Sequence, residues 1–302
     1  MKFKLELDIP PLGSINYQKP VLCIGSCFAQ NIGRRLIDNR FKVVLNPNGI
    51  LFNPISIGNA LLAKNYSEAD LVERDEVWFS WQHHSSFSGT SRETVLHGIQ
   101  REHELLTSTL ENSEHSLFLT LGSAWVYEYE GKVVANCHKQ PNGQFTKRLL
   151  SIEEIVAHLG PILEKSKAKQ VVLTVSPVRY VKDGLHNNNL SKATLLLAVK
   201  KLCDLVKHVH YFPAYEMVID ELRDYRFFDR DLVHPSEEAI DYVWEAFRKT
   251  YFDSQSLEMA RAWSNIKSRL NHRILHPDTK TAKSFLSKLA DDQRKFETGY
   301  FP

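Results

Sequence analysis

Cys27 is the residue of this chain best placed to act as a nucleophile. It follows Gly25 and Ser26 after the apolar run 21–24, where a buried strand is predicted to end and a helix to begin. A thiol at a helix N-terminus faces unpaired backbone N–H groups and the positive end of the helix dipole. Both favour the thiolate, and the N–H groups can also hold an oxyanion. We therefore predict a lowered pKa for Cys27. Ser26 is an alternative nucleophile, and a small buried side chain at a strand–helix junction is the structural alternative.

Asp231 and His234 form a second reactive pair, late in the chain. Three residues apart in a turn, the carboxylate can accept a hydrogen bond from imidazole Nδ1. This fixes the tautomer and leaves Nε2 free to take a proton from a nucleophile. Asp229 is an alternative acid. The structural alternative is a turn-capping Asp231 beside a surface His234, so the pair predicts acid–base chemistry only in combination with Cys27.

The elements that must position these residues alternate between strands and helices. Apolar runs predict strands at residues 21–24, 41–45, 117–121, 171–175 and 209–212. Periodicity and capping signals predict helices at residues 28–36, 54–64, 91–110, 151–166, 190–206, 215–224 and 236–250. This alternation is typical of an α/β fold with a parallel sheet covered on both faces.

Three further segments depart from this alternation. Residues 77–90 predict a loop with one short strand, and residues 126–134 predict a hairpin. Residues 253–302 predict a C-terminal helical extension to an α/β domain of residues 1–252, with packing or homo-oligomer contact as its role.

Small and reactive residues follow the predicted strands at one edge of the sheet. They are Cys27, Gly49, Ser123, Arg179 and, after a further helix, His234. In open parallel sheets, ligands bind outside the carboxyl ends of the strands. This clustering is the main evidence from the residues themselves for a site. Arg179 could hold a phosphate or carboxylate there, or form a structural ion pair.

The aromatic loop adds candidate binding residues. His83 and His84 could line a substrate cleft with Trp78, Trp81 and Trp125, since aromatic faces suit sugar rings. Packing in the core or at an interface is the alternative for these tryptophans.

Metal and cofactor signals are weak. Cys137 and His138 could bind zinc with Cys23, Cys27 or His83, but the chain has no C-x-x-C pair. It also lacks a Walker-type loop and a G-x-G-x-x-G motif. We expect neither a metal nor a cofactor.

Composition narrows the class of protein. The 302 residues have a formal net charge of +2, from 38 Lys+Arg and 36 Asp+Glu, which does not favour nucleic-acid binding. No apolar stretch approaches a membrane span, and the N-terminus has no secretory h-region. Four cysteines do not form a disulfide framework. We expect a cytoplasmic protein that is not bound to a membrane.

The segment Gly25-Ser26-Cys27-Phe28-Ala29 resembles the defining motif of the GSCFA family, a bacterial group similar to SGNH/GDSL hydrolases. Residues 120–123, 135–139 and 231–236 resemble later blocks of that family, and the resemblance spans roughly residues 20–250. It implies a three-layer α/β/α fold with a flavodoxin-like sheet.

The resemblance also implies roles for individual residues. Cys27 takes the place of the nucleophilic serine, and Asp231 and His234 match the last block. Gly49 falls at the oxyanion glycine, whereas the third-block Gly-x-Asn is missing after Gly122. Asn136 is a candidate replacement for that amide, and Ser123 and His138 are candidate binding residues in the later blocks.

The expected function is therefore an acyl-ester hydrolase or acyltransferase. The resemblance implies that it acts on a small-molecule or glycan ester, with an O-acylated glycan or glycoconjugate as the substrate class. The missing block-three Asn favours an alternative, a non-catalytic carbohydrate- or ligand-binding module. An oligomeric scaffold built through residues 253–302 is a third hypothesis.

Overall fold

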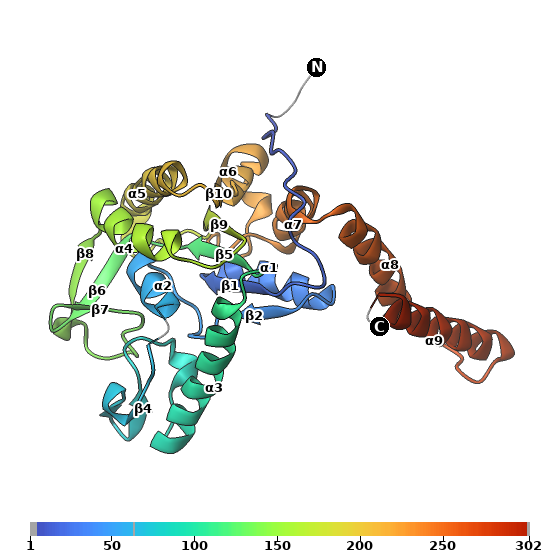
Figure 1. Ribbon diagram of the computed structural model, residues 1–302, viewed down its shortest axis with the longest axis horizontal. Helices are drawn as coiled ribbons and strands as arrows, with labels where there is room; N and C mark the ends of the chain where they lie inside the picture. The colour runs from blue at the N-terminus through green and yellow to red at the C-terminus, as the bar shows by residue number, and fades with distance from the viewer. Residues whose placement is uncertain (1–4, 63, 301–302) are drawn as a thin grey trace.

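The centre of the protein is a parallel sheet of five strands (Figure 1). The computed structural model describes residues 5–62 and 64–300. The start of the predicted α/β domain (1–4) and the end of the predicted extension (301–302) therefore lie outside the described residues. The strands are β1 (Val21–Gly25), β2 (Val43–Leu45), β5 (Ser116–Leu121), β9 (Gln170–Val175) and β10 (Val209–Tyr211). Their spatial order is β2-β1-β5-β9-β10, a flavodoxin-like order with its switch point between β1 and β5.

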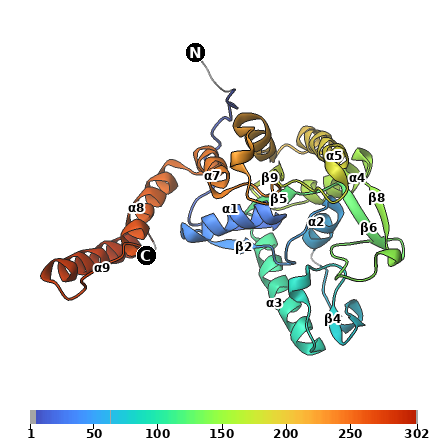
Figure 2. The same ribbon diagram turned by 180° about the vertical axis from the view of Figure 1, so that it is seen from behind.

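Alternate side chains of each strand face opposite helical layers, because the side-chain period of a strand is two. In β1, Val21 and Cys23 belong to one core cluster, and Leu22 and Ile24 belong to the other. The first cluster is covered by α1 (Cys27–Asp38) and α7 (Glu237–Tyr251). The second is covered by α2 (Pro54–Leu61), α3 (Arg92–Glu111), α4 (Ile152–Glu164) and α5 (Gly184–Leu205) (Figure 2). The predicted three-layer α/β/α fold is confirmed.

Two antiparallel excursions leave the central sheet. The first is the hairpin of β3 (Val72–Arg74) and β4 (Val77–Phe79), and the second is a three-stranded sheet of β6 (Trp125–Tyr129), β7 (Lys132–Val134) and β8 (Thr146–Leu149). The hairpin predicted at residues 126–134 is β6–β7. Strand β8 was not predicted, because its sequence Thr-Lys-Arg-Leu has no apolar alternation. It pairs with β6, which makes that sheet a rigid wall beside the strand ends.

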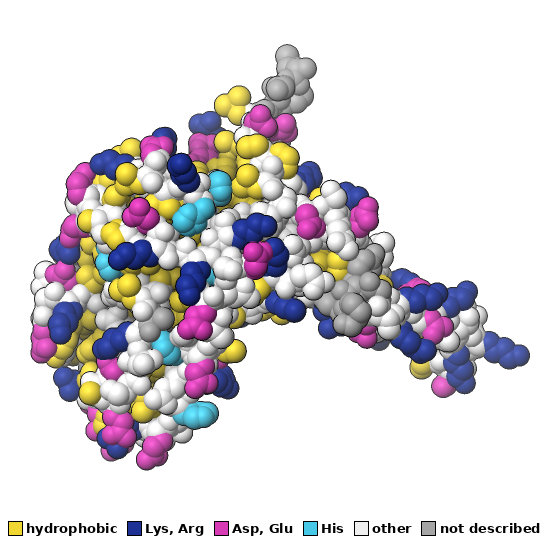
Figure 3. Space-filling view, in the orientation of Figure 1, with side chains coloured by type: hydrophobic (Ala, Val, Ile, Leu, Met, Phe, Trp, Pro, Cys, Tyr) yellow, Lys and Arg dark blue, Asp and Glu magenta, His cyan; other side chains and the backbone are white. Residues whose placement is uncertain are grey.

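The last two helices form an antiparallel arm that projects from the α/β body (Figure 1). They are α8 (Ser254–Leu270) and α9 (Lys280–Tyr300), and Asp253 caps α8. Trp263 and Phe296 extend the core of the α1–α7 layer into the arm, and Trp263 Nε1 donates to the Asp38 carbonyl at 2.7 Å. Lys and Arg side chains cover much of its visible surface (Figure 3). None of the described helices combines the length and apolarity that a membrane crossing needs.

Candidate active site

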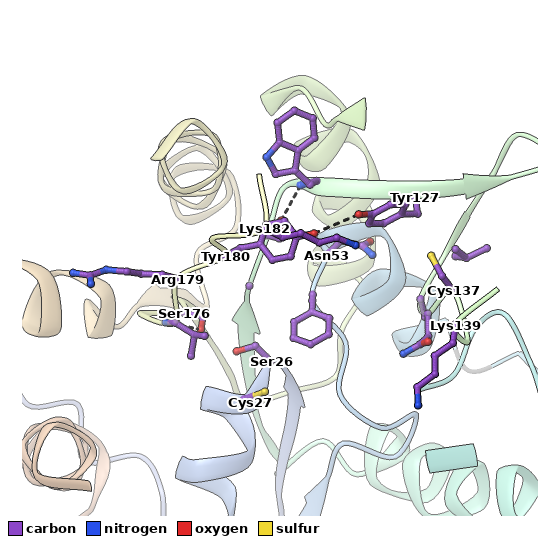
Figure 4. A pocket seen from close by; sticks show the side chains of 18 of the residues that line it. Ser26, Cys27, Asn53, Tyr127, Cys137, Lys139, Ser176, Arg179, Tyr180 and Lys182 are labelled. Carbon is purple, nitrogen blue, oxygen red and sulfur yellow. Dashed lines mark hydrogen bonds between the residues drawn. The ribbon is translucent and has the colours of Figure 1, made fainter. Parts of the chain in front are cut away.

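A pocket of about 440 Å³ lies beyond the carboxyl ends of the central strands (Figure 4). Its lining includes Cys27 after β1, Ser123 after β5 and Ser176 after β9. The pocket therefore spans the switch point between β1 and β5, where ligands bind in open α/β sheets. This is the edge at which the sequence predicts a site.

Gly25 and Ser26 shape the turn that delivers Cys27 to the pocket. Gly25 has φ +144°, and a Cβ there would lie 2.2 Å from the Thr120 carbonyl oxygen, so only glycine fits. Ser26 is the N-cap of α1, and its Oγ accepts the Phe28 N–H at 3.2 Å. Ser26 is 2% exposed and engaged in capping, whereas Cys27 is half-buried at the first turn of α1. The local geometry favours Cys27 over Ser26 as the nucleophile.

The electrostatics of Cys27 differ from the prediction. Burial raises the pKa of the Cys27 thiol, and a hydrogen bond from its own backbone N–H opposes this only in part. The prediction of a lowered pKa is wrong, because it considered the helix N-terminus and not the removal of the sulfur from water. A thiol with a raised pKa needs a base to become a nucleophile.

Asp231 and His234 form the predicted pair. His234 Nδ1 donates to Asp231 Oδ2 at 2.7 Å, while Asp231 Oδ1 accepts the backbone N–H groups of Val233 and His234. The hydrogen bond to His234 is the main cause that lowers the pKa of Asp231 to about 2. Because Nδ1 is engaged, Nε2 is the nitrogen left to exchange a proton with a substrate or nucleophile. Asp229, the alternative acid, instead uses its backbone, whose N–H donates to the His234 carbonyl.

Arg179 ties the Asp231–His234 loop to the pocket wall. Its backbone N–H donates to the Val233 carbonyl at 3.1 Å, and its guanidinium donates to the Leu232 carbonyl at 3.3 Å. The guanidinium also stacks on Phe228, 3.9 Å from the ring centroid. In Figure 4 the Arg179 side chain points away from Cys27. Arg179 therefore holds the loop, and neither the predicted ion pair nor an anion contact is part of this arrangement.

Cys27 and His234 do not form a hydrogen bond with each other in the described residues, and His234 is not among the side chains that line the pocket. The loop that carries His234 is attached to the pocket wall through Arg179. Catalytic hydrogen bonds are often long in proteins without ligand and tighten when substrate binds.

The candidate oxyanion donors fall into two groups. The backbone N–H of Cys27 points to its own sulfur, which places it beside the reacting atom. Asn136 lines the pocket, and its Oδ1 accepts the His138 N–H at 2.7 Å, which leaves its amide N–H groups available. The N–H of Ser123 instead donates to the Phe52 carbonyl at 2.9 Å. The N–H of Gly49 donates to the Asn46 carbonyl at 2.7 Å, outside the pocket. The structure therefore does not support Gly49 as a donor and places Ser123 in the lining only.

Three predicted binding histidines lie away from the pocket. His83 is 1% exposed, with Nε2 3.1 Å from Asn48 Nδ2, and burial lowers its pKa to about 3. His138 stacks on Phe79, and its Nε2 donates to the Ser80 carbonyl at 3.0 Å. His84 caps a short helical turn through Ser86 N–H. All three stabilise the aromatic loop, and this corrects their assignment as binding residues.

Of the three tryptophans expected in the cleft, only Trp125 lines the pocket. Trp81 stacks on Tyr129, and Trp78 packs under Arg92. The sequence pattern did not distinguish these packing roles from a binding role.

Lys192 is a buried basic side chain beneath the pocket that the sequence pattern did not reveal. It is 2% exposed, and its Nζ donates to the Gly122 and Ser176 carbonyls, each at 2.7 Å. Both acceptors line the pocket, so Lys192 ties the ends of β5 and β9 together from below. The available signal was its position on the buried stripe of α5 with Leu195 and Val199.

The pocket walls hold further residues that the sequence pattern did not identify. They include Phe52, Tyr127 and Tyr180, the amides Asn53, Gln140 and Asn142, and the cations Lys139 and Lys182. Most come from β6, the segment after β7 and the segment after β9, whose pairing in space is not visible in local sequence. Within the described residues, no group of three or more His, Cys, Asp or Glu side chains could hold a metal ion.

Comparison with known proteins identifies one match. Residues 20–247, more than half of the chain, match the model of the GSCFA family. The matched region contains Cys27, Asp231 and His234 and ends within α7, before the helical arm. No curated protein and no solved structure matches the chain.

Proposed function

The chain belongs to the GSCFA family, and from this premise and the geometry of the pocket we propose that it is a cysteine-dependent acyl-ester hydrolase or acyltransferase. The observation that carries the proposal is the position of Cys27. It is the half-buried thiol at the N-terminus of α1, in a pocket at the sheet switch point. A loop with a hydrogen-bonded Asp231–His234 pair is attached to the wall of the same pocket.

The reaction begins when His234 Nε2 removes the proton from Cys27 Sγ and the sulfur attacks the ester carbonyl carbon. Asp231 orients the imidazole and stabilises its protonated form. The backbone N–H of Cys27 and the amide of Asn136 are the available donors for the oxyanion. When the tetrahedral intermediate collapses, the C–O bond breaks and the departing alcohol takes the proton from His234.

The product of this first half is a thioester on Cys27. A water molecule or a second alcohol then gives its proton to His234 and attacks the thioester, which releases the acid or the transferred ester and returns the proton to the sulfur. The raised pKa of Cys27 makes proton removal by His234 a necessary part of the mechanism.

The lining of the pocket supports a sugar ester as the substrate. Aromatic rings of Phe52, Trp125 and Tyr180 offer faces for the C–H surface of a sugar, and Asn53 and Gln140 offer amides for hydroxyl groups. We propose an O-acylated glycan or glycoconjugate on this basis. All four cysteines are free, so we further propose the cytoplasm as its location, where reducing conditions keep Cys27 a thiol.

A non-catalytic carbohydrate-binding module is the second candidate. The observation in its favour is that no hydrogen bond joins Cys27 to His234 in the part of the chain that the structure describes. Such a module would use the same aromatic and amide lining without chemistry at the sulfur.

A covalent trapping experiment separates the two candidates. The protein is mixed with p-nitrophenyl acetate, its intact mass is measured within seconds, and any adduct is located by peptide mapping. We expect one acetyl group on Cys27, absent in Cys27→Ala and retained in Cys137→Ala, because Cys137 lines the same pocket and is the matched control. An adduct that persists in Cys27→Ala would exclude Cys27 as the nucleophile. No adduct and no ester cleavage above background would favour the binding module.

A further inference from the structure

The charged side chains that line the pocket are all cations. They are Lys139, Arg179 and Lys182, and none of the described lining residues is Asp or Glu. The net charge of the whole chain is only +2, so the excess of positive charge in the pocket is local. A cleft lined by charges of one sign attracts ligands of the opposite sign, so this pocket should attract an anion.

None of these three cations forms an ion pair with a carboxylate in the described residues, but Arg179 is held by other contacts. Arg179 is engaged with the Leu232 carbonyl and the Phe228 ring, which leaves Lys139 and Lys182. The acidic residue next to Lys182 in the chain, Asp183, forms its ion pair with Lys147. Neither Lys139 nor Lys182 pairs with a carboxylate in the described residues. Their ammonium groups are therefore available to a ligand.

The positive charge of Lys182 acts inside the pocket. Burial raises the pKa of the Cys137 thiol, and the charge of Lys182 works against this effect. Figure 4 shows Cys137 and Lys139 on one side of the pocket, and Ser176 and Arg179 on the other. Both lysines are exposed at the rim of the pocket, so their attraction for an anion should weaken as salt concentration rises.

We propose that the substrate of this pocket carries an anionic group, a carboxylate or a phosphate, that is held by Lys139 and Lys182 while its ester reaches Cys27. This refines the substrate class and rests on the proposed function for the position of the ester. For a sugar ester, the anion is the carboxylate of a uronic acid or the phosphate of a sugar phosphate. The aromatic and amide residues of the same lining then face the sugar ring.

Binding of three simple sugars tests the proposal. Glucuronate, glucose 1-phosphate and glucose are titrated into the full chain, and binding is followed by ligand-observed NMR or calorimetry. We expect at least one anionic sugar to bind more tightly than glucose and to lose affinity as salt concentration rises. A preference for glucuronate identifies a carboxylate site, and a preference for glucose 1-phosphate identifies a phosphate site. Equal binding of glucose, or no binding of either anion, would overturn the proposal.

Charge variants assign the site. Lys139→Gln and Lys182→Gln should each weaken binding of the preferred anion by roughly two- to fivefold, as expected for an ion pair with an exposed lysine. Lys132→Gln is the matched control, since Lys132 is exposed on the neighbouring strand β7 and does not line the pocket. Equal affinities in all three variants would show that neither Lys139 nor Lys182 binds the anion.

Failure of this inference and failure of the proposed function are distinguishable. The binding measurement does not depend on chemistry at Cys27 and can be repeated in Cys27→Ala. Anion binding without an acetyl adduct on Cys27 would retain the anionic ligand and reject the enzyme. An adduct on Cys27 without a preference for anions would retain the enzyme and reject the anionic substrate.

Discussion

Replacing Lys192 with methionine should change how the stability of the protein depends on pH. Lys192 is buried beneath the pocket, and burial lowers the pKa of its amine from 10.5 to about 7. Between these two values the unfolded chain binds a proton that the folded protein does not, so the free energy of unfolding rises with pH over that window. A methionine of similar length removes the titrating group and leaves the Gly122 and Ser176 carbonyls without their donor.

The size of this pH effect on the free energy of unfolding follows from the lowered pKa of Lys192. One pKa unit corresponds to about 1.4 kcal/mol, so between about pH 6 and pH 9 the wild type should gain about 2.5 kcal/mol relative to Lys192→Met. Urea unfolding of both proteins across this range measures the difference, and other titrating groups cancel between them. Lys200→Met is the control, because Lys200 lies exposed on the same helix. Parallel curves for wild type and Lys192→Met would refute a desolvated amine at this position.

Three further substitutions test how the site is positioned. Gly25→Ala should lower the free energy of unfolding by about 3 kcal/mol or more, since its Cβ would overlap a backbone oxygen; an unchanged urea midpoint would contradict the close approach. Ser26→Ala should cost about 1 kcal/mol through loss of the N-cap, yet still give an acetyl adduct on Cys27 by intact mass; a stable variant without the adduct would make Ser26 the nucleophile. Arg179→Lys should slow acetylation of Cys27 by roughly tenfold, because lysine cannot both stack on a ring and bind the loop that carries His234; an unchanged rate in stopped-flow would mean that other contacts hold the loop.

The central sheet could be predicted because its signals are local. The fully buried strands β1, β5 and β9 are predominantly apolar, and Ser151 with Glu154 forms the predicted capping box at the start of α4. Alternation predicts only that the sheet is parallel, whereas its flavodoxin-like order was implied by the resemblance. The edge of the sheet that carries Cys27 could therefore be identified before the structure.

The walls of the pocket could not be predicted in the same way. Strand β8 is mostly polar and pairs with β6, a contact that no local pattern records. The sequence suggests a binding role for His83 from its place in the aromatic loop, and the resemblance suggests one for His138. The folded chain buries them against Phe79, Ser80 and Asn48 instead. Lys192 was missed for the opposite reason, since a lysine in a helix is ordinarily exposed.

The same limitation explains the misjudged pKa of Cys27. A helix N-terminus is visible in sequence, whereas the aromatic and aliphatic walls that remove the sulfur from water come from distant segments. This outcome changes the expected chemistry. In the proposed mechanism a thiolate would need no base for attack, but a buried thiol needs His234 as its base. The exchange of sulfur for oxygen would then retain the base-assisted attack and alter the intermediate. The proposed thioester can pass the acyl group to an alcohol as well as to water, so the acceptor that enters the pocket would decide between transfer and hydrolysis.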